Sequence, residues 1–274
     1  MNWEVAASIR RILVGPEVLV ADFRCPGERR GWTREATSHF VLELPRRGAH
    51  LRAIGRERVL ADPTIAALSF PGDELSIASP SAAPQESTLV GLAGTVAEEL
   101  APGGSPRIVR LSPGTALLHQ RLVTTKDPVA VEEGAVLLAA RVLEDARGVA
   151  SRAEARPSAS HRRLAEEMQH LIATRHHEGL TLANITSACG ASTFHGSRVF
   201  RAVVGETVHR HLRRVRLRAA LFDLAAANGR LSELALRAGF SSHSHFTAAF
   251  QSEFACLPSD VAALDRAWLR LRPR

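Results

Sequence analysis

The chain has 274 residues, which is enough for two domains that each bury a core of their own. A hydrophobic content of 45% and a charged content of 23% are ordinary for a soluble globular protein. No apolar run approaches the length of a membrane span, and no charged-then-apolar signal pattern opens the sequence, so we expect a cytoplasmic protein with no membrane partner. Cys25, Cys189 and Cys256 form no CxxC pair and fit reduced thiols.

The net charge of +7 is confined to the C-terminal part of the chain. Residues 158–274 contain 16 Arg and no Lys against 9 acidic residues, whereas residues 1–157 are neutral overall. This asymmetry favours a module that binds a polyanion, joined to a neutral module. The plainer alternative is a basic surface that maintains solubility.

Residues 20–125 have the pattern of a β-rich domain. Short apolar runs separated by turn residues predict strands at 39–44, 49–54, 59–61, 64–70 and 75–78, and 108–111 and 116–118 continue the pattern. This spacing is typical of a small barrel or sandwich. Phe23, Trp32, Phe40 and Phe70 either line a pocket or fill a solid core, and the sequence predicts no particular ligand-binding residue.

From Asp127 onward the pattern becomes helical. Asp127 is a suitable N-cap and Pro128 a suitable first helical residue. The helix at 128–146 either packs on its own barrel or presents an apolar stripe to a second copy; the stripe consists of Val136, Leu137, Ala140 and Leu143. Residues 147–160 are rich in Ala, Arg and Ser and predict a linker between domains at 1–146 and 161–274.

The C-terminal part is predicted to be all-helical and contains an internal repeat. Ser158 or Ser160 caps its first helix, and a long central helix covers about 206–227. Three residues recur 49 positions later and two recur 50 positions later: Leu182, Ile185 and Gly190 as Leu231, Leu234 and Gly239, then Phe200 and Val204 as Phe250 and Phe254. Each copy has a short helix, a turn with Gly and a second helix, which predicts helix-turn-helix units at about 181–204 and 231–254.

Helical spacing separates the buried and exposed faces of the two second helices. The outward residues suit base edges and phosphates, and we expect them to bind double-stranded DNA. They are Thr193, Phe194, Ser197, Arg198 and Arg201 in the first unit, and Ser242, His243, Ser244, His245, Thr247 and Gln251 in the second. Two alternatives stay open: Phe194 folds onto its own helix instead of contacting thymine methyls, and Arg198 contacts phosphate without reading sequence.

These residues carry a family resemblance over about residues 161–264. Ser192, Arg198, Phe200, Gly205, the motif Arg216-Leu217-x2-Ala220 and above all the run from Gly239 to Phe250, followed by Pro258, resemble the AraC/XylS family of transcription regulators. The resemblance implies two helix-turn-helix units joined by the central helix, with recognition helices that enter successive major grooves about 34 Å apart.

The chain departs from the family pattern at Gly196, where the family usually has Leu and the second copy has Phe246. A Gly there is expected to remove a core side chain and to weaken the helix by about 1 kcal/mol. We therefore expect the second unit to supply most of the sequence specificity. Ala255 and Leu257 also replace the family's Gly and Thr before the Pro.

The β-rich half resembles, more weakly, the cupin-like sensor domain found before this DNA-binding module. The stretch 40–80 carries the likeness, and such barrels hold small ligands. The sequence therefore predicts an α+β multidomain chain with an N-terminal cupin-like β-barrel and a C-terminal all-α double helix-turn-helix. The expected partners are promoter DNA, a small-molecule effector and a second copy of the chain, with RNA polymerase as a further possible partner.

Three rival functions are compatible with parts of the sequence. A metal-dependent cupin enzyme needs an HxH pair, but this half has only His39, His50 and His119, so no catalytic residue, metal or cofactor is predicted. The pairs His209/His211 and His243/His245 have a spacing that turns them to different sides of a helix. The other rivals are a regulator controlled by a protein partner or by no effector, and a sequence-independent nucleic-acid binder.

Overall fold

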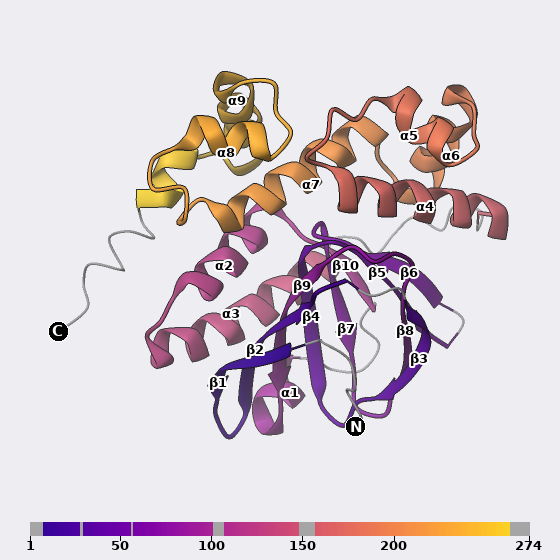
Figure 1. Ribbon diagram of the computed structural model, residues 1–274. Helices are drawn as coiled ribbons and strands as arrows, with labels where there is room; N and C mark the ends of the chain where they lie inside the picture. Colours follow the sequence, from indigo (N-terminus) through magenta and orange to yellow (C-terminus); the bar gives the residue numbers. More distant parts are fainter. Residues whose placement is uncertain (1–7, 28–29, 56, 101–106, 148–156, 264–274) are drawn as a thin grey trace. The chain divides into compact units, whose positions relative to one another are not determined.

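The computed structural model describes residues 8–27, 30–55, 57–100, 107–147 and 157–263, and the chain divides into two compact units, Met1–Ala150 and Ser151–Arg274 (Figure 1). The described part of the first unit is rich in strands, and every regular element described in the second is a helix. The predicted α+β class is confirmed. Most of the predicted linker at 147–160 falls on 148–156, outside the described residues.

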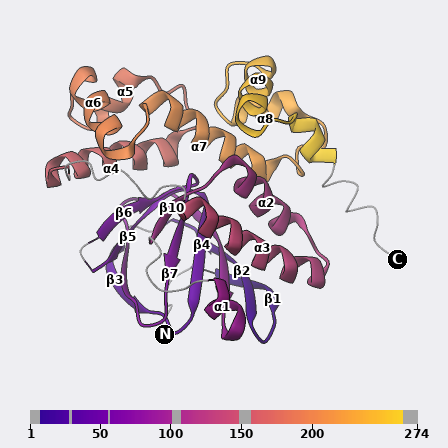
Figure 2. The same cartoon turned by 180° about the vertical axis from the view of Figure 1, so that it is seen from behind.

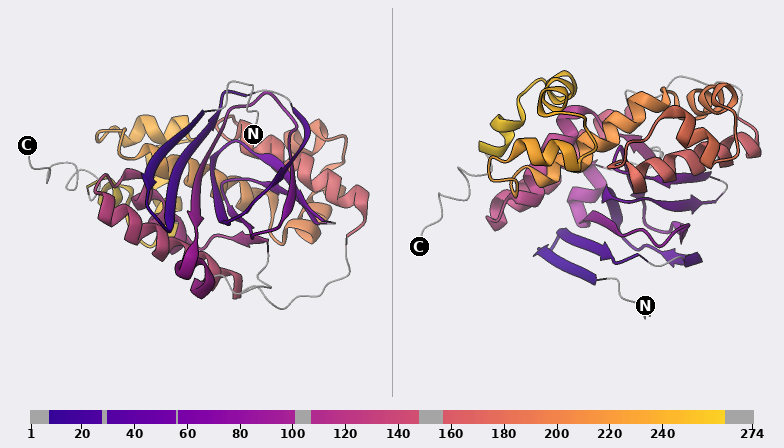
Figure 3. Two further views of the ribbon diagram at one scale, coloured as in Figure 1. Left: turned by 90° about the horizontal axis from the view of Figure 1, so that it is seen from below. Right: turned by 45° about the horizontal axis from the view of Figure 1, so that its top comes forward.

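The strands described in the N-terminal unit form two antiparallel sheets. The first has the order β1 (Ser8–Val14), β2 (Val18–Cys25), β9 (Gln85–Leu92), β4 (Phe40–Arg47), β7 (Ile65–Ser69) and β10 (Ile108–Arg110). The second has the order β3 (Arg30–Ala36), β8 (Glu74–Ser79), β5 (His50–Ile54) and β6 (Glu57–Ala61). The two sheets curve around a common interior (Figure 3, left). The strands predicted at 39–44, 49–54, 59–61, 64–70, 75–78 and 108–111 are confirmed.

Three helices accompany these sheets: α1 (Gly94–Leu100), α2 (Pro113–Thr124) and α3 (Pro128–Arg147) (Figure 2). Helix α3 packs on the six-stranded sheet and buries Ala135, Leu138 and Val142 in its core. Leu143, a member of the predicted apolar stripe, is also buried there, whereas Leu137 is half exposed. The structure therefore favours the alternative in which this helix packs on its own unit.

The strand predicted at 116–118 is wrong, because these residues lie in α2. Ser112 caps this helix by accepting a hydrogen bond from the backbone N–H of Thr115, and Pro113 occupies its first turn. The buried face of α2 includes the polar residues Thr115, His119 and Gln120. Those polar residues conceal the apolar helical periodicity on which the sequence prediction relied.

The aromatic residues of the N-terminal unit divide between core and cavity. Phe40 and Phe70 are buried in the main core, with ring centroids 5.3 Å apart. Phe23 instead lines a cavity between the sheets. Trp32 is exposed, with the guanidinium carbon of Arg58 5.3 Å from its ring. Both roles that the sequence left open for these residues therefore occur, since Phe23 lines a pocket whereas Phe40 and Phe70 fill the core.

The C-terminal unit contains the helices α4 (Ala159–Arg175), α5 (Leu182–Ala188), α6 (Thr193–Val204), α7 (Val208–Asp223), α8 (Leu231–Arg237) and α9 (His243–Phe254). Of the two predicted caps for α4, Ser158 is the one that caps it. Helix α7 is shorter than the predicted 206–227. It begins at 208 because Thr207 accepts a hydrogen bond from the backbone N–H of Arg210, and its C-cap is Leu224.

The C-terminal ends of α6 and α9 are equivalent but carry different residues. Gly205 follows α6 with φ of +80°, and Ala255 follows α9 with φ of +57°. A Cβ atom is unfavourable in this left-handed conformation. We predict that Ala255→Gly stabilises the unit by about 1 kcal/mol and that Gly205→Ala destabilises it by a similar amount. Urea unfolding of the two variants measures both; changes of the same sign would contradict the assignment.

Candidate nucleic-acid interface

The two copies of the repeat have the same local construction. Ser192 caps α6 by accepting a hydrogen bond from His195 N at 3.2 Å, and Ser242 caps α9 by accepting one from His245 N at 3.1 Å. The turn before each cap contains a glycine with positive φ. Gly239 is needed most strictly, because a Cβ there would lie 2.5 Å from the carbonyl oxygen of His176. Sequence therefore fixes where each second helix begins.

The exposed face of α6 is basic. Phe194 is 74% exposed, and Arg198 and Arg201 are also exposed. The guanidinium carbon of Arg198 lies 5.8 Å from the ring centroid of Phe194, so the two side chains lie beside each other on the surface. Thr193 is exposed, and Ser197 is half-buried and donates to the carbonyl oxygen of Phe194. This face offers two cations and an apolar ring.

The exposed face of α9 has a different chemistry. His243, Ser244 and Gln251 are exposed, and Thr247 is half-buried with its hydroxyl 3.4 Å from His243 Nε2. His245 is exposed, but its Nδ1 lies 3.1 Å from Ser241 Oγ and its ring contacts Phe240 edge-on. The predicted contact residues of this helix contain no Arg or Lys, so it presents hydrogen-bonding groups instead of fixed cations.

Helix α7 connects the two copies and holds them through buried charges. The two carboxylate oxygens of Glu206 lie 3.0 Å from His211 Nδ1 and 3.1 Å from an Arg214 nitrogen. Arg214 Nε and an Arg218 nitrogen lie 3.5 and 3.6 Å from the carboxylate of Glu253 in α9. The rings of His211 and Phe200 pack edge-on, and His211 is fully buried, so it is a packed core residue. The network ties the end of α6 to α9.

A second connection joins α7 to the end of α4. The Arg216 side chain donates to the carbonyl oxygens of His176 and Glu178, at 2.7 and 2.8 Å. These carbonyls lie at the C-terminal end of α4, where backbone acceptors lack helical partners. Burial lowers the pKa of Arg216. Its part in the family-like motif is therefore structural.

Comparison with known families agrees with this geometry. Residues 185–263 match the family described as a helix-turn-helix domain. The second part of the chain is therefore a helix-turn-helix domain. The match confirms this part of the AraC/XylS resemblance, and it covers α6, α7, α8 and α9 whole.

Several solved structures share features with the chain at low identity. ToxT from Vibrio cholerae, in a structure with a bound unsaturated fatty acid, is 11% identical with a TM-score of 0.37, covering 90% of this chain and 95% of its own. An AraC-type DNA-binding domain-containing regulator from Chromobacterium violaceum is 23% identical with a TM-score of 0.36, covering 39% and 96%. A cupin superfamily protein from Desulfitobacterium hafniense is 12% identical with a TM-score of 0.29, covering 34% and 84%. Since all three TM-scores are low, the assignment rests on the family match and the helix geometry.

The expected defect at Gly196 in the helix-turn-helix domain is not a cavity. Gly196 is buried, and a Cβ built on it would lie 2.5 Å from the methyl carbon of Thr186 in α5. The equivalent pair in the second copy is Ala235 and Phe246, both buried. At these two equivalent positions the larger side chain lies on the first helix in one copy (Thr186) and on the second helix in the other (Phe246). The sequence prediction missed this because it considered one position alone.

We predict that Gly196→Ala destabilises the domain by about 1–3 kcal/mol, although Ala is the better helix former by about 1 kcal/mol. The reason is the overlap with the Thr186 methyl, which is held because its hydroxyl donates to the carbonyl oxygen of Leu182 at 3.0 Å. Thr186→Ser removes that methyl and keeps the hydroxyl. In the Thr186→Ser background, Gly196→Ala should lose its penalty in urea unfolding; an equal penalty in both backgrounds would contradict this contact.

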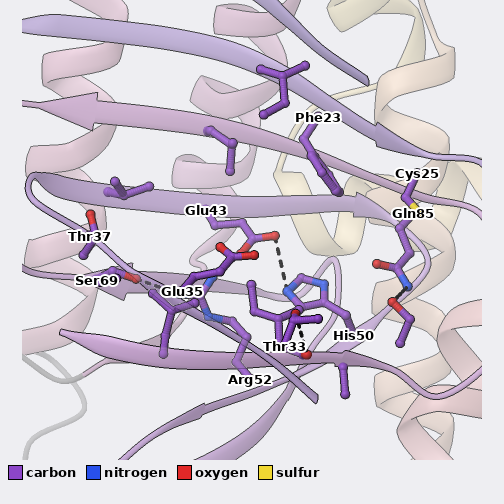
Figure 4. Close-up of a pocket in the computed structure, with 18 residues that line it drawn as sticks. Phe23, Cys25, Thr33, Glu35, Thr37, Glu43, His50, Arg52, Ser69 and Gln85 are labelled. Carbon is purple, nitrogen blue, oxygen red and sulfur yellow. Dashed lines mark hydrogen bonds and ion pairs between the residues drawn. The ribbon is translucent and has the colours of Figure 1, made fainter. Parts of the chain in front are cut away.

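The N-terminal unit contains a cavity of about 210 Å³ between its two sheets. Its charged groups lie close to one another, with Thr37 and Ser69 on one side of them and Gln85 on the other (Figure 4). Glu43 comes from the six-stranded sheet, and it pairs across the cavity with Arg52 and His50 of the four-stranded sheet. Ser87 donates to Glu43 at 3.0 Å, and Arg52 donates to Ser69 at 2.7 Å.

Burial alone would raise the pKa of Glu43, but the charges of His50 and Arg52, with hydrogen bonds from His50 and Ser87, hold that pKa well below its ordinary value. Glu43 is therefore ionised. None of these residues was singled out as a ligand-binding residue from the sequence. A usable signal exists, because His50 and Arg52 alternate within a predicted strand and so share one face.

Among the described residues, no group of three or more His, Cys, Asp or Glu side chains is placed to hold a metal ion. In the same part of the chain, no helix is long and apolar enough to cross a membrane.

Proposed function

We propose that this chain is a sequence-specific DNA-binding transcription regulator of the AraC/XylS type, controlled by a small molecule that binds the N-terminal cavity. The observation that carries the proposal is the pair of second helices, α6 and α9, each with an exposed face of side chains that suit phosphates or base edges. The excess of Arg over acidic residues in this half of the chain supports it. The proposed domains are 1–146 and 161–274, with residues 147–160 as the linker.

The two helices are proposed to divide the work. In α6, Arg198 and Arg201 contact phosphates and Phe194 packs on bases or sugars. Thr193 donates a hydrogen bond, and the Ser197 oxygen, whose proton is engaged by Phe194, accepts one. In α9, the residues that read base edges are His243, Ser244, Thr247 and Gln251. Ser242 caps this helix by accepting a hydrogen bond from His245 N, and these two residues hold the start of the helix against the DNA backbone. The proposed division of roles between α6 and α9 rests on the different charge of their exposed faces, and not on a weaker first unit at Gly196.

The test begins with selection of a preferred site from a random DNA library by the full chain. A regulator should prefer that site over scrambled DNA by about 10³-fold or more. A sequence-independent binder would show no such preference and a strong salt dependence.

With the selected site in hand, we predict different losses for the two helices. Arg198→Ala should weaken selected and scrambled duplexes alike and reduce the salt slope by about 1. His243→Ala should reduce discrimination by about 1–3 kcal/mol. Fluorescence anisotropy at several salt concentrations measures both, with Arg163→Ala as the control, because Arg163 is an exposed cation on α4. A larger loss of discrimination in Arg198→Ala than in His243→Ala would refute the division.

Control by a small molecule is supported by the cavity, which lies between two sheets and is lined by both apolar and charged side chains. The fatty acid in the ToxT structure is a property of ToxT. The alternative is control by a protein partner or by no effector. A change in site affinity with a metabolite extract depleted of protein favours the small molecule, and a change that needs the protein fraction favours the partner.

The remaining parts of the proposal concern assembly and location. We propose a cytoplasmic homodimer that recruits RNA polymerase at promoters. Sedimentation at micromolar concentration tests the dimer. A metal-dependent cupin enzyme is the least favoured function, and stoichiometric iron or manganese in the purified chain would revive it.

A further inference from the structure

The charges around the N-terminal cavity are not equally available to a ligand. Arg52 and His50 have side chains only 5% exposed, and Glu43 is 8% exposed. Both terminal nitrogens of Arg52 already donate, one to Glu43 and one to Ser69. This cluster compensates its own charge within the wall of the cavity.

Glu35 is the exception. It lies on β3, lines the same cavity and is half-buried. Its carboxylate has no hydrogen bond or ion pair with any other described residue. Figure 4 shows it beside the carboxylate of Glu43. Burial and the charge of Glu43 raise the pKa of Glu35, against the opposing charges of Arg52 and His50. A carboxylate in this position is destabilised by its surroundings, and a cation bound beside it in the cavity would relieve that cost.

The rest of the wall is mostly apolar, with a few neutral polar side chains such as Thr33 and Gln85; its larger apolar residues are Ile9, Phe23, Val41, Leu75, Ile77 and Leu89. One buried polar atom adds to this pattern, because Nε of Arg52 has no hydrogen-bond acceptor among the described residues. A hydroxyl or carbonyl on a ligand would supply one. The lining therefore fits a compact apolar body with few polar groups.

We propose that the cavity binds an amine with a small apolar body, and that Glu35 pairs with its ammonium group. This inference rests on the proposed effector role of the N-terminal unit and names the chemical class of the effector. An anionic ligand fits less well, because it would meet two carboxylates, and both terminal nitrogens of Arg52 already donate to Glu43 and Ser69, which leaves only Nε to face it. A cation neutralises the carboxylate of Glu35, which has no hydrogen bond or ion pair with another described residue.

The test uses three probes of one size and shape: hexylamine, 1-hexanol and hexanoate. Binding to the full chain is measured by calorimetry without DNA. Hexylamine should bind more tightly than hexanol and hexanoate, and Glu35→Gln should weaken hexylamine by about 10-fold or more while leaving hexanol unchanged. Without a ligand, Glu35→Gln should melt at a higher temperature than the wild type, because it removes the uncompensated charge.

Glu74→Gln is the matched control, since Glu74 is exposed on β8, the strand that pairs with β3. It should change neither binding nor melting. Tighter binding of hexanoate than of hexylamine, an equal loss in both Gln variants, or no binding of hexylamine at about 1 mM would each overturn the proposal. Because the experiment contains no DNA, those outcomes leave the regulator function standing. Loss of DNA site preference would refute that function whatever the cavity binds.

Discussion

Replacement of Glu206 by Ala should destabilise the helix-turn-helix domain by about 3–5 kcal/mol. Glu206 is 7% exposed and accepts hydrogen bonds from both His211 and Arg214. Its removal leaves the buried guanidinium of Arg214 with less compensation, although Glu253 remains 3.5 Å away, which places the loss toward the lower end of that range. Hydrogen exchange of the α7 amides in the full chain measures the effect, because it resolves the two units separately.

The control for this variant is Glu233→Ala. Glu233 pairs with Arg230 at 3.7 Å, but both side chains are more than half exposed, so its loss should change stability by no more than about 0.5 kcal/mol. The Glu206 variant should also weaken DNA binding at both helices together, since the network joins the end of α6 to α9. Equal protection of α7 in the two variants would show that the buried network adds no stability.

The repeat of the C-terminal half was readable from the sequence because its determinants are local. A cap such as Ser192, a turn glycine such as Gly239 and the spacing of Phe246 and Phe250 act within one or two turns of helix. The strands at β4, β5 and β8 were readable for the same reason, since alternation and turn residues are short-range signals. These features place the exposed faces of α6 and α9 without any knowledge of tertiary contacts.

What the sequence could not show depends on partners far along the chain. The fit between Thr186 and Gly196 depends on the packing of α5 on α6. At position 196 alone, the sequence shows only that a side chain is missing. The cluster around the cavity needs Glu43 and Arg52 to lie in different sheets. That placement follows from the pairing of β4 with β9 and β7 and of β5 with β6 and β8, which no local pattern specifies.

Glu43→Gln should destabilise the N-terminal unit by about 3–5 kcal/mol at neutral pH. The carboxylate of Glu43 is buried and holds Arg52, His50 and Ser87 across the two sheets. The amide keeps the shape but loses the charge, so it leaves the guanidinium of Arg52 buried without its counterion. Hydrogen exchange of the β4 and β5 amides in the full chain measures the loss, with Glu74→Gln as the exposed control that should change little.

The difference in stability between the wild type and Glu43→Gln should depend on pH, and the pKa of Glu43 sets the direction of that dependence. Because the folded chain holds that pKa well below the ordinary carboxyl value of about 4.3, the ionised form stabilises the fold. This stability is fully present above pH ~4.3 and is lost as the pH falls below it, toward the pKa of the folded chain. The gap between wild type and Glu43→Gln should therefore narrow on acidification, while the gap to Glu74→Gln stays flat. A stability difference that widened in acid would mean that the folded chain favours the protonated form of Glu43. The ion pair between the two sheets would then not be what stabilises the cavity wall.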